Sequence, residues 1–505
     1  MPSAATAKRR RPISPAALLM LLLAAGLRFG GLLLDSRFHP DEALFATFAR
    51  GAAVQGYWLL PGPLDKPPLA LYAQALAMAA AGVTTLPDGV LTLNARAGEI
   101  AARLPGTLGG LVLVAALSAA ARRLYGPRAG LLALGLAAGS PYLAAFSATA
   151  FTDSLMLPCL GLALWAAAAG RWWWAGIGVA LGFGCKQQAL LFLPLLALLA
   201  AGRRASLWRA LAALLLPTLV AAAALGAWDA ARAEPAGVWA LAVANNDPGR
   251  IIRPDEALPR LAAWVEYAGL AAGSPPLTAG LALLAGTALA ARAGRRQPLA
   301  GTDLRLAAYC LGYGLLQWLV AFNIYDRYLL IPLLPGLLLL ARGLDGLASI
   351  LRCPAAGGAL AGLVALMLLP TAVEAVGGRM TIGADRGQHA GIDALAAYLN
   401  AQPLGTIIYD HWLGWELGYY LGPWSDKRRV YYPTPASLAD GARRQPDPAT
   451  RYWVAPAWVD PQPWLGTLQA AGFGVRMAYD DGRFWAYALT PPPPGGAAVS
   501  TAGSS

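Results

Sequence analysis

Long apolar segments alternate with short polar ones over the first three quarters of the chain. Many of them have the length of about 20 residues that a helix needs to cross a bilayer. The pattern predicts a polytopic α-helical membrane protein of about 11–13 transmembrane helices, and eleven spans can be named: 15–34, 103–121, 128–147, 155–170, 174–186, 188–201, 208–228, 275–292, 304–322, 328–341 and 357–376.

The apolar residues 67–82 decide the topology. If they cross the membrane, every later basic cluster moves to the outside. If they lie on the outer face, the clusters fall inside, as the positive-inside rule favours. We therefore expect a cytoplasmic basic N-terminus (1–14), a retained membrane anchor, and an outer loop at 35–102.

From residue 377 the frequency of charged, proline and aromatic residues rises. Alternating runs predict strands and helices that together form a small extracytoplasmic α/β domain at 377–490. The expected strands are 406–410, 451–456 and 483–489, and the expected helices are 391–400 and 463–472. The tail 491–505 has low complexity and is predicted to be disordered.

Composition agrees with a membrane protein. The chain is 57% hydrophobic and 13% charged, whereas soluble domains are roughly one quarter charged. Its net charge of +12 comes from short basic clusters between apolar runs, which is typical of cytoplasmic loops and argues against a nucleic acid partner. The four cysteines lie far apart without a CxxC pair, so neither a disulfide framework nor a zinc site is expected.

The first candidate chemistry lies in "FHPDEALFATFARG", residues 38–51. Pro40 suits the first position of a helix, and Asp41 and Glu42 oppose the positive end of its dipole. Helix capping is therefore one explanation for this acidic pair. A metal site that adds His39 is a weaker one.

The second candidate is Lys66 in "GPLDKPPLALY". It lies just before a helix start, where a cation opposes the dipole but where the free N–H groups bind anions such as phosphate. A local ion pair with Asp65, or contact with lipid headgroups, are the alternatives. A carboxylate and a phosphate-binding cation on one outer loop are what group transfer from a phosphate leaving group requires.

Three further charged residues lie near predicted span ends. Asp153 in "SATAFTDSLMLP" either caps the next helix or belongs to the site. Lys186 in "GFGCKQQALLF" lies in an apolar stretch, where ionisable groups usually line a cavity. Arg327 in "NIYDRYLLIPLLP" has the interface position at which an anchor is the more common role.

Taken together, "HPDEA", "DKPP", "TAFTD" and "DRYLLIPLLP" resemble the GT-C membrane glycosyltransferases, in particular the protein O-mannosyltransferase-like family 39 and the bacterial aminoarabinose transferases. The resemblance covers roughly residues 12–345. It implies an inverting enzyme of the cell inner (plasma) membrane that moves a sugar from a polyprenyl-phosphate donor. The acceptor on the outer face is a lipid, a glycan or a protein.

The resemblance also implies roles for single residues. Asp41 matches the acid that acts as general base, Glu42 matches its neighbour, and Asp153 matches a second acidic position. Lys66 matches the residue that contacts the lipid-borne phosphate. Leu44 replaces an arginine that helps to hold phosphate in the aminoarabinose transferases.

Because that arginine is missing, Lys186 and Arg327 are candidate partners of Lys66 in phosphate binding. Lys186 lies in "CKQQ", where some family members have a "TK" motif. No cofactor is required, although a divalent cation on Asp41, Glu42 and Asp153 is possible in principle.

A transporter or flippase of lipid-linked saccharides is the alternative function. It predicts charges near the middle of the membrane and often a repeated half. The acids instead cluster on one outer loop and no internal repeat is found, which favours the enzyme. The aromatic residues of the C-terminal domain fit ordinary core packing better than a sugar-binding face.

Overall fold

The computed structural model describes residues 14–83, 94–202, 206–295, 300–350, 356–422, 427–445 and 449–492. The predicted cytoplasmic residues 1–13, the tail from 493, and Cys353 lie outside these ranges. The chain divides into two compact units. The first contains Met1–Leu34, Tyr57–Gln74 and Arg103–Arg386, and the second contains Asp35–Gly56, Ala75–Ala102 and Gly387–Ser505.

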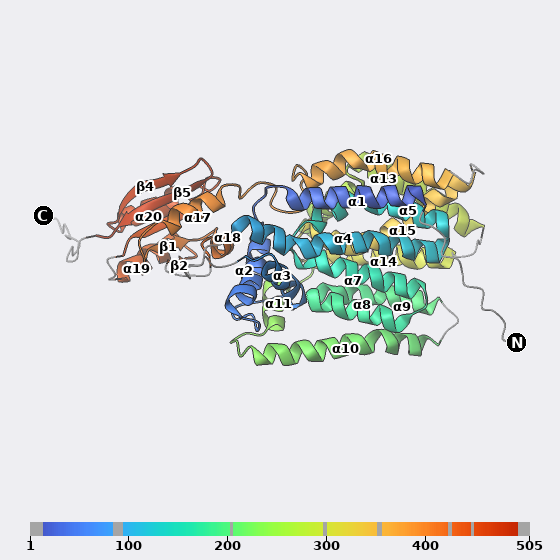
Figure 1. The fold of residues 1–505 in the computed structure, drawn as a ribbon, viewed down its shortest axis with the longest axis horizontal. Coiled ribbons are helices and arrows are strands. Elements are labelled where there is room, and N and C mark those ends of the chain that lie inside the picture. Colours follow the sequence, from blue (N-terminus) through green and yellow to red (C-terminus); the bar gives the residue numbers. More distant parts are fainter. Residues whose placement is uncertain are drawn as a thin grey trace. The chain divides into compact units, whose positions relative to one another are not determined.

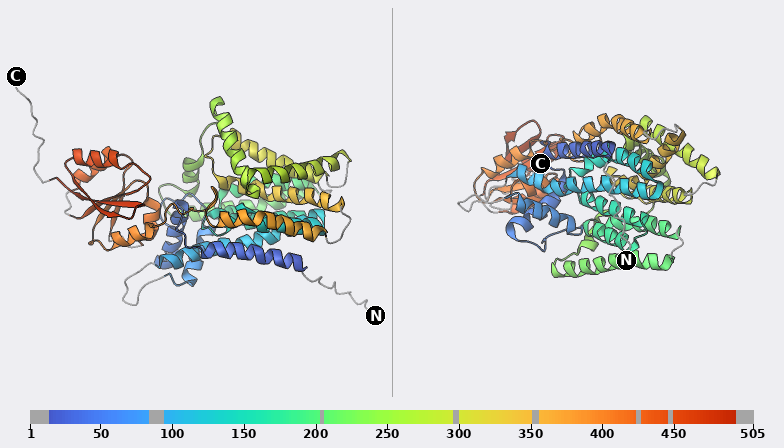
Figure 2. Two further views of the ribbon diagram at one scale, coloured as in Figure 1. Left: turned by 90° about the horizontal axis from the view of Figure 1, so that it is seen from above. Right: turned by 45° about the vertical axis from the view of Figure 1, so that its right-hand side comes forward.

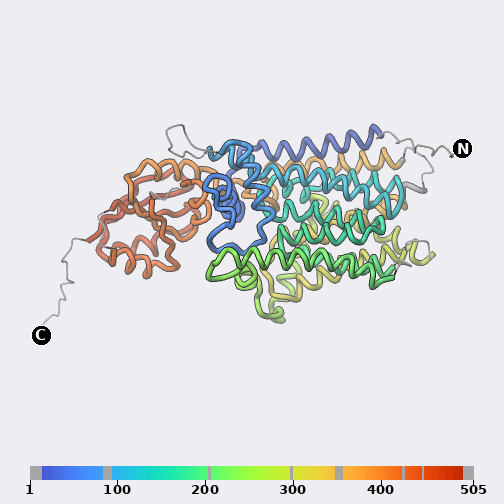
Figure 3. The backbone as a smooth tube through the Cα atoms, turned by 60° about the horizontal axis from the view of Figure 1, so that its bottom comes forward, coloured from blue at the N-terminus to red at the C-terminus, as the bar shows by residue number. Residues whose placement is uncertain are grey.

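The first unit is a bundle of apolar helices that run alongside one another, with α1 next to α16 (Figures 1 and 3). Two helices, α3 (Leu69–Ala80) and α4 (Ala95–Tyr125), have residues in both units. The other helices of this unit are α1 (Pro15–Leu33), α5 (Pro127–Gly139), α6 (Pro141–Ser147), α7 (Thr152–Ala168), α8 (Trp172–Cys185), η1 (Gln187–Phe192), α9 (Leu193–Ala201), α10 (Leu207–Ala231), α11 (Val238–Asn246), η2 (Pro254–Glu256), α12 (Ala257–Gly269), η3 (Leu270–Ala272), α13 (Pro275–Gly294), α14 (Ala300–Leu319), η4 (Asp326–Leu329), α15 (Leu330–Ile350) and α16 (Ala356–Val376).

Every predicted span overlaps a helix, and the polytopic helical fold class is confirmed. The span count is lower than predicted. Within the described residues, 6 helices are long and apolar enough to cross a membrane, or 7 if α5 and α6 form one span. These two helices meet at a bend of 57°, where Pro141 has no N–H to continue the helical ladder. The predicted spans at α7, α8 and η1–α9 are apolar but shorter than a full crossing.

Glycines let α8 approach a helix on each side. A Cβ on Gly176 would lie 2.5 Å from the Ala213 carbonyl oxygen of α10. A Cβ on Gly178 would lie 2.9 Å from the Cys159 carbonyl oxygen of α7. Because both obstacles are backbone atoms, neither can move aside without shifting a helix. Small residues permit this kind of close packing in membrane bundles.

We expect Gly176→Ala to destabilise the bundle by about 1–3 kcal/mol, because the new methyl group overpacks the contact between α8 and α10. The apparent melting temperature of the purified protein would fall. Gly226→Ala on α10 is the matched control, since no atom lies within 4 Å of its Cβ position. Alanine also favours the helix there. Equal melting temperatures for the two variants would contradict this packing argument.

The second unit contains a five-stranded mixed sheet of order β2-β1-β3-β5-β4. Strand β1 is parallel to β2 and β3, whereas β5 is antiparallel to β3 and β4. Helices lie on both sides of the sheet (Figure 2). The elements are α2 (Pro40–Gln55), α17 (Ile392–Asn400), β1 (Ile407–Asp410), α18 (Gly414–Tyr420), β2 (Arg428–Tyr431), α19 (Pro435–Arg444), β3 (Arg451–Pro456), α20 (Gln462–Ala470), β4 (Gly474–Asp480) and β5 (Phe484–Thr490).

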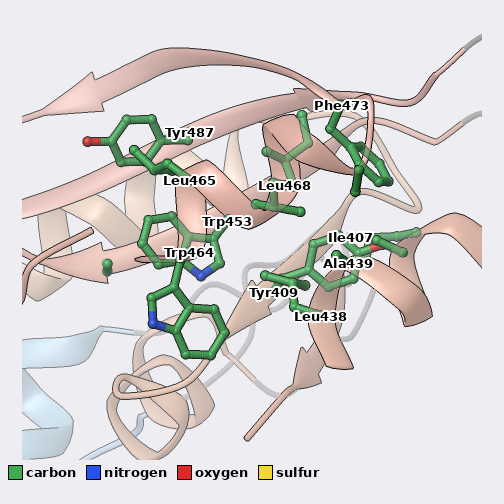
Figure 4. Close-up of a cluster of buried hydrophobic side chains, with 14 residues drawn as sticks. Ile407, Tyr409, Leu438, Ala439, Trp453, Trp464, Leu465, Leu468, Phe473 and Tyr487 are labelled. Carbon is green, nitrogen blue, oxygen red and sulfur yellow. The ribbon is translucent and has the colours of Figure 1, made fainter. Parts of the chain in front are cut away.

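Aromatic residues fill the core between this sheet and helices α19 and α20 (Figure 4). The indoles of Trp453 and Trp464 stack with ring centroids 5.9 Å apart, and Tyr487 lies 5.6 Å from Trp453. Tyr409 is fully buried in the same cluster. Core packing, rather than a sugar-binding face, therefore accounts for these rings.

All three predicted strands and both predicted helices of this domain are present as β1, β3, β5, α17 and α20. Strands β2 and β4 were not predicted. They form the two edges of the sheet, and most of their residues are exposed or half-buried. Edge strands often carry charged side chains that prevent pairing with another chain. These charged residues weaken the apolar pattern from which strands are predicted. The predicted outer loop 35–102 is also divided, since 35–56 and 75–102 group with the C-terminal residues.

Candidate active site

A buried ion pair lies at the centre of the candidate site in the helical unit. Asp153 occupies the first turn of α7, and Lys186 lies in the break between α8 and η1. Lys186 Nζ donates to both carboxylate oxygens of Asp153 at 2.8 Å. The two residues are 2% and 4% exposed. The N-cap residue of α7 is Phe151, and Asp153 in the first turn uses both carboxylate oxygens to bind Lys186.

A second ion pair joins Lys66 Nζ to Asp65 Oδ2 at 2.5 Å. The predicted local pair is therefore present. The Asp65 segment is held from two other elements. Gln187 Nε2 donates to the Asp65 carbonyl oxygen at 2.8 Å, and Asn245 Nδ2 donates to Oδ2 at 3.4 Å. Because Gln187 follows Lys186 directly, the loop carrying Lys66 is attached next to the buried pair.

Arg327 approaches the same region from η4. Its guanidinium carbon lies 4.7 Å from the Tyr325 ring centroid and 5.2 Å from that of Phe151. Lys186 Nζ in turn lies 5.8 Å from the ring of Tyr328. Arg327 and Lys66 both lie close enough to Lys186 for their positive charges to repel its ammonium group. The structure thus brings together four residues that the sequence proposed separately.

The cluster has one more cation than carboxylates, so it can bind an anionic group. Its members are Lys66, Lys186, Arg327, Asp65 and Asp153. Lys186 is already neutralised by Asp153, which is buried beside it. Lys66 and Arg327 are the more accessible cations, and Arg327 presents a planar guanidinium that can bind phosphate oxygens in bidentate fashion. A leaving phosphate here would meet positive charge fixed in place before the reaction.

Asp41 and Glu42 belong to the second unit, in the first turn of α2. His39 is the N-cap residue, and its Nδ1 accepts from the Asp41 N–H at 3.1 Å. Glu42 is fully buried, and its Oε2 accepts from the His39 N–H at 3.1 Å. This reciprocal capping box confirms the capping interpretation for Glu42. Asp41 is half-buried.

The loop before α2 is anchored within the same unit by residues that the sequence did not indicate. The Phe38 N–H donates to the Tyr420 hydroxyl at 2.9 Å, and that hydroxyl donates to Glu99 Oε1 at 2.5 Å. Arg50 of α2 donates to the backbone carbonyl oxygens of Gly418 and Tyr419. Helix α18 therefore supports both the loop before α2 and the later part of α2, the helix that carries Asp41 in its first turn.

Within the part of the chain that the structure describes, no ligand set for a divalent cation can be named. Among the residues described, no three His, Cys, Asp or Glu side chains come together in a group able to hold a metal. Glu42 serves the helix cap and Asp153 binds Lys186. The possible cation predicted from Asp41, Glu42 and Asp153 stays a prediction.

Known proteins resemble this chain both in the sequence around the site and in the fold. Residues 65–228 match the family "dolichyl-phosphate-mannose-protein mannosyltransferase", and this stretch contains Lys66, Asp153 and Lys186. The fold resembles the crystal structure of ArnT from Cupriavidus metallidurans bound to undecaprenyl phosphate. The two share 16% identity with a TM-score of 0.63, over 93% of this chain and 97% of the other. The chain therefore has the same fold as this ArnT structure.

These comparisons confirm the resemblance to the GT-C glycosyltransferases. The apolar helices confirm the prediction of a multi-pass membrane protein. The apo form of the same ArnT is similar, with 17% identity and a TM-score of 0.61 over 93% of this chain and 97% of that one. The archaeal oligosaccharyltransferase AglB from Archaeoglobus fulgidus, in complex with an inhibitory peptide and a dolichol-phosphate, gives 12% identity and a TM-score of 0.51 over 94% of this chain and 74% of its own. No curated protein sequence matches the chain.

The buried pair leads to a stability prediction. We expect Asp153→Asn to destabilise the protein by about 3–5 kcal/mol, because it leaves Lys186 charged and unpaired in an apolar surrounding. Adding Lys186→Met should restore most of the apparent melting temperature. Glu256→Gln, which breaks the exposed Arg250–Glu256 pair, is the matched control and should change little. If Asp153→Asn is no more harmful than this control, the pair is not the constraint described here.

The anchoring of the first loop gives a second prediction. Tyr420→Phe removes the hydroxyl that holds the Phe38 N–H, so amide hydrogen exchange in residues 35–45 should become faster by about tenfold, as for a lost hydrogen bond of roughly 1–1.5 kcal/mol. Mass spectrometry of peptic fragments measures this rate. Tyr431→Phe, at an exposed tyrosine of the same unit, is the control. Unchanged exchange in the Tyr420 variant would contradict the anchoring role.

Proposed function

We propose that the protein transfers a sugar, with inversion at the anomeric carbon, from a polyprenyl-phosphate donor to an acceptor at the outer face of the membrane. The observation that carries this proposal is the gathering of Asp153, Lys66 and Arg327 around Lys186. Two of these cations lie within the stretch that matches the dolichyl-phosphate-mannose-protein mannosyltransferases.

A cavity in the helical unit supports a lipid-linked donor. Its volume is about 710 Å³, and it lies between helices α12, α13, α14 and α15. The lining is almost wholly apolar and includes Trp264, Leu311 and Leu333. Such an apolar space suits an isoprenoid chain, which enters from the bilayer and is held by packing against the apolar side chains. The ArnT and AglB structures contain undecaprenyl phosphate and dolichol-phosphate.

In the proposed reaction, Asp41 acts as the general base. It takes the proton from an acceptor hydroxyl or amine as that atom attacks the anomeric carbon. The bond between that carbon and the phosphate oxygen breaks, and polyprenyl phosphate leaves with the electron pair. Lys66 and Arg327 stabilise the negative charge on the leaving phosphate. Lys186, held by Asp153, positions this cation cluster.

The flippase alternative requires charges along a path through the bilayer. The candidate charges instead occur at breaks between helices: Lys66 before α3, Lys186 after α8, and Arg327 before α15. The family that residues 65–228 match is also a family of transferases. The enzyme is therefore the function that these observations favour.

Transfer from radiolabelled polyprenyl-phosphate sugars tests the proposal, with the purified protein in liposomes and envelope extract as acceptor. We expect Asp41→Asn to lower kcat by about 10²–10⁴, the usual contribution of a general base. Lys66→Met should lower kcat/KM by about 10²–10³, as for the loss of one fixed charge at the leaving group.

Asp255→Asn is the control, because this aspartate is exposed and lies outside both candidate groups. It should transfer sugar at the wild-type rate. Full activity in Asp41→Asn would overturn the role of the base, and full activity in Lys66→Met would overturn the phosphate site. Movement of labelled lipid between leaflets without any transfer would favour the flippase instead.

A further inference from the structure

The sheet of the C-terminal unit has a topological switch point. Strands β1 and β3 are parallel neighbours, so their carboxyl ends lie at the same edge. The chain leaves β1 through α18 toward β2 on one side, and leaves β3 through α20 toward β4 on the other. In open α/β sheets, ligands bind in the crevice that forms where two such connections diverge.

The last residue of β1 is a carboxylate that its surroundings do not satisfy. Asp410 is 2% exposed, and neither of its side-chain oxygens has a hydrogen-bond partner among the residues described. Burial raises the pKa of Asp410 to about 6, against the opposing effect of the positive charges of Arg429 and His411. Buried polar groups in native structures are nearly always paired. Burying the Asp410 carboxylate without a hydrogen-bond partner costs free energy. A bound ligand that donates hydrogen bonds to it would remove that cost.

The groups next to Asp410 complete a candidate site. Tyr431 is its register partner on β2, is 60% exposed, and stacks on the His411 ring at an interplanar angle of 13°. Arg429, two residues earlier, is exposed and donates to the Gly414 carbonyl oxygen. A Cβ on Gly414 would lie 3.3 Å from Asp410 Oδ1, so the absence of a side chain keeps the approach to this oxygen open.

The chemistry of these groups selects one class of ligand. Asp410 offers two hydrogen-bond acceptors, Arg429 offers donors, and Tyr431 offers an aromatic face. A divalent cation is disfavoured by the guanidinium of Arg429 and by the lack of a third ligand among the residues described. Glu416, which is fully buried, is engaged by His389 Nε2 at 3.1 Å. Adjacent hydroxyls of a sugar both donate and accept, and the apolar face of the sugar ring packs on aromatic rings.

We propose that Asp410, Arg429 and Tyr431 bind one sugar unit of a glycan through two adjacent hydroxyls, at the carboxyl end of β1. Arg429 leaves the Gly414 carbonyl when the sugar enters and donates to a sugar oxygen instead. This site shares no residue with the transfer site proposed above, and it binds saccharide without the lipid donor.

Binding of the methyl glycosides of mannose, galactose, glucose and arabinose to the full-length protein in detergent tests this proposal. Saturation-transfer NMR and the shift in apparent melting temperature report on binding, with 1,4-butanediol as a polyol that lacks adjacent hydroxyls. We expect at least one glycoside to bind and the butanediol not to bind. Asp410→Asn should weaken this binding at least tenfold. Asp440→Asn, at an exposed aspartate of the same unit, should leave it unchanged.

The unliganded Asp410→Asn protein separates binding from a structural role. The ionised form of Asp410 destabilises the fold above its raised pKa of about 6, and this cost disappears as the pH falls toward 4. Asp410→Asn should therefore raise the apparent melting temperature at pH 7.5 but change it little at pH 4.5, whereas a structural carboxylate would lose stability.

The proposal is overturned if no glycoside binds the wild-type protein, if Asp410→Asn binds as well as wild type, or if that variant melts at a lower temperature at pH 7.5. Because no lipid donor is present, none of these results depends on whether the protein transfers sugar.

Discussion

The burial of Lys186 is the constraint on which the candidate site depends. An ammonium group among apolar helices is tolerated only when a carboxylate is fixed against it, and Asp153 meets this need with both oxygens at 2.8 Å. This pairing holds the start of α7 against the break after α8. The same break places Gln187 where it binds the segment of Asp65 and Lys66. One electrostatic requirement thus orders three elements of the bundle.

The sequence was informative where physical signals are local. Apolar length placed the helices, and short strand-like runs between helical patterns placed β1, β3 and β5. It was less informative about spans, because a run of apolar residues does not reveal a bend such as that between α5 and α6, or the short lengths of α7 and α8. Edge strands β2 and β4 escaped prediction because exposure on an edge removes the apolar pattern.

The same distinction applies to the site. The Asp65–Lys66 pair and the capping box of His39 and Glu42 join close neighbours, so residue types alone indicated them. The Asp153–Lys186 pair joins positions 33 residues apart, and no spacing rule links them. The contact between Phe38 and Tyr420 spans 382 residues. Pairings of this kind arise from tertiary packing and became visible only in the folded chain.

That last contact has a consequence for biosynthesis. A chain made from its N-terminus releases the loop before α2 early, whereas Gly418 and Tyr420 follow hundreds of residues later. Until α18 has been made and folded, helix α2 and the loop before it lack the support of Tyr420 and of the α18 carbonyl groups. A chain cut short after the bundle would therefore carry every candidate charge of the helical unit with an unanchored first loop. Folding of the C-terminal domain is therefore the last step of assembly. Only a chain that includes α18 can anchor the loop before α2.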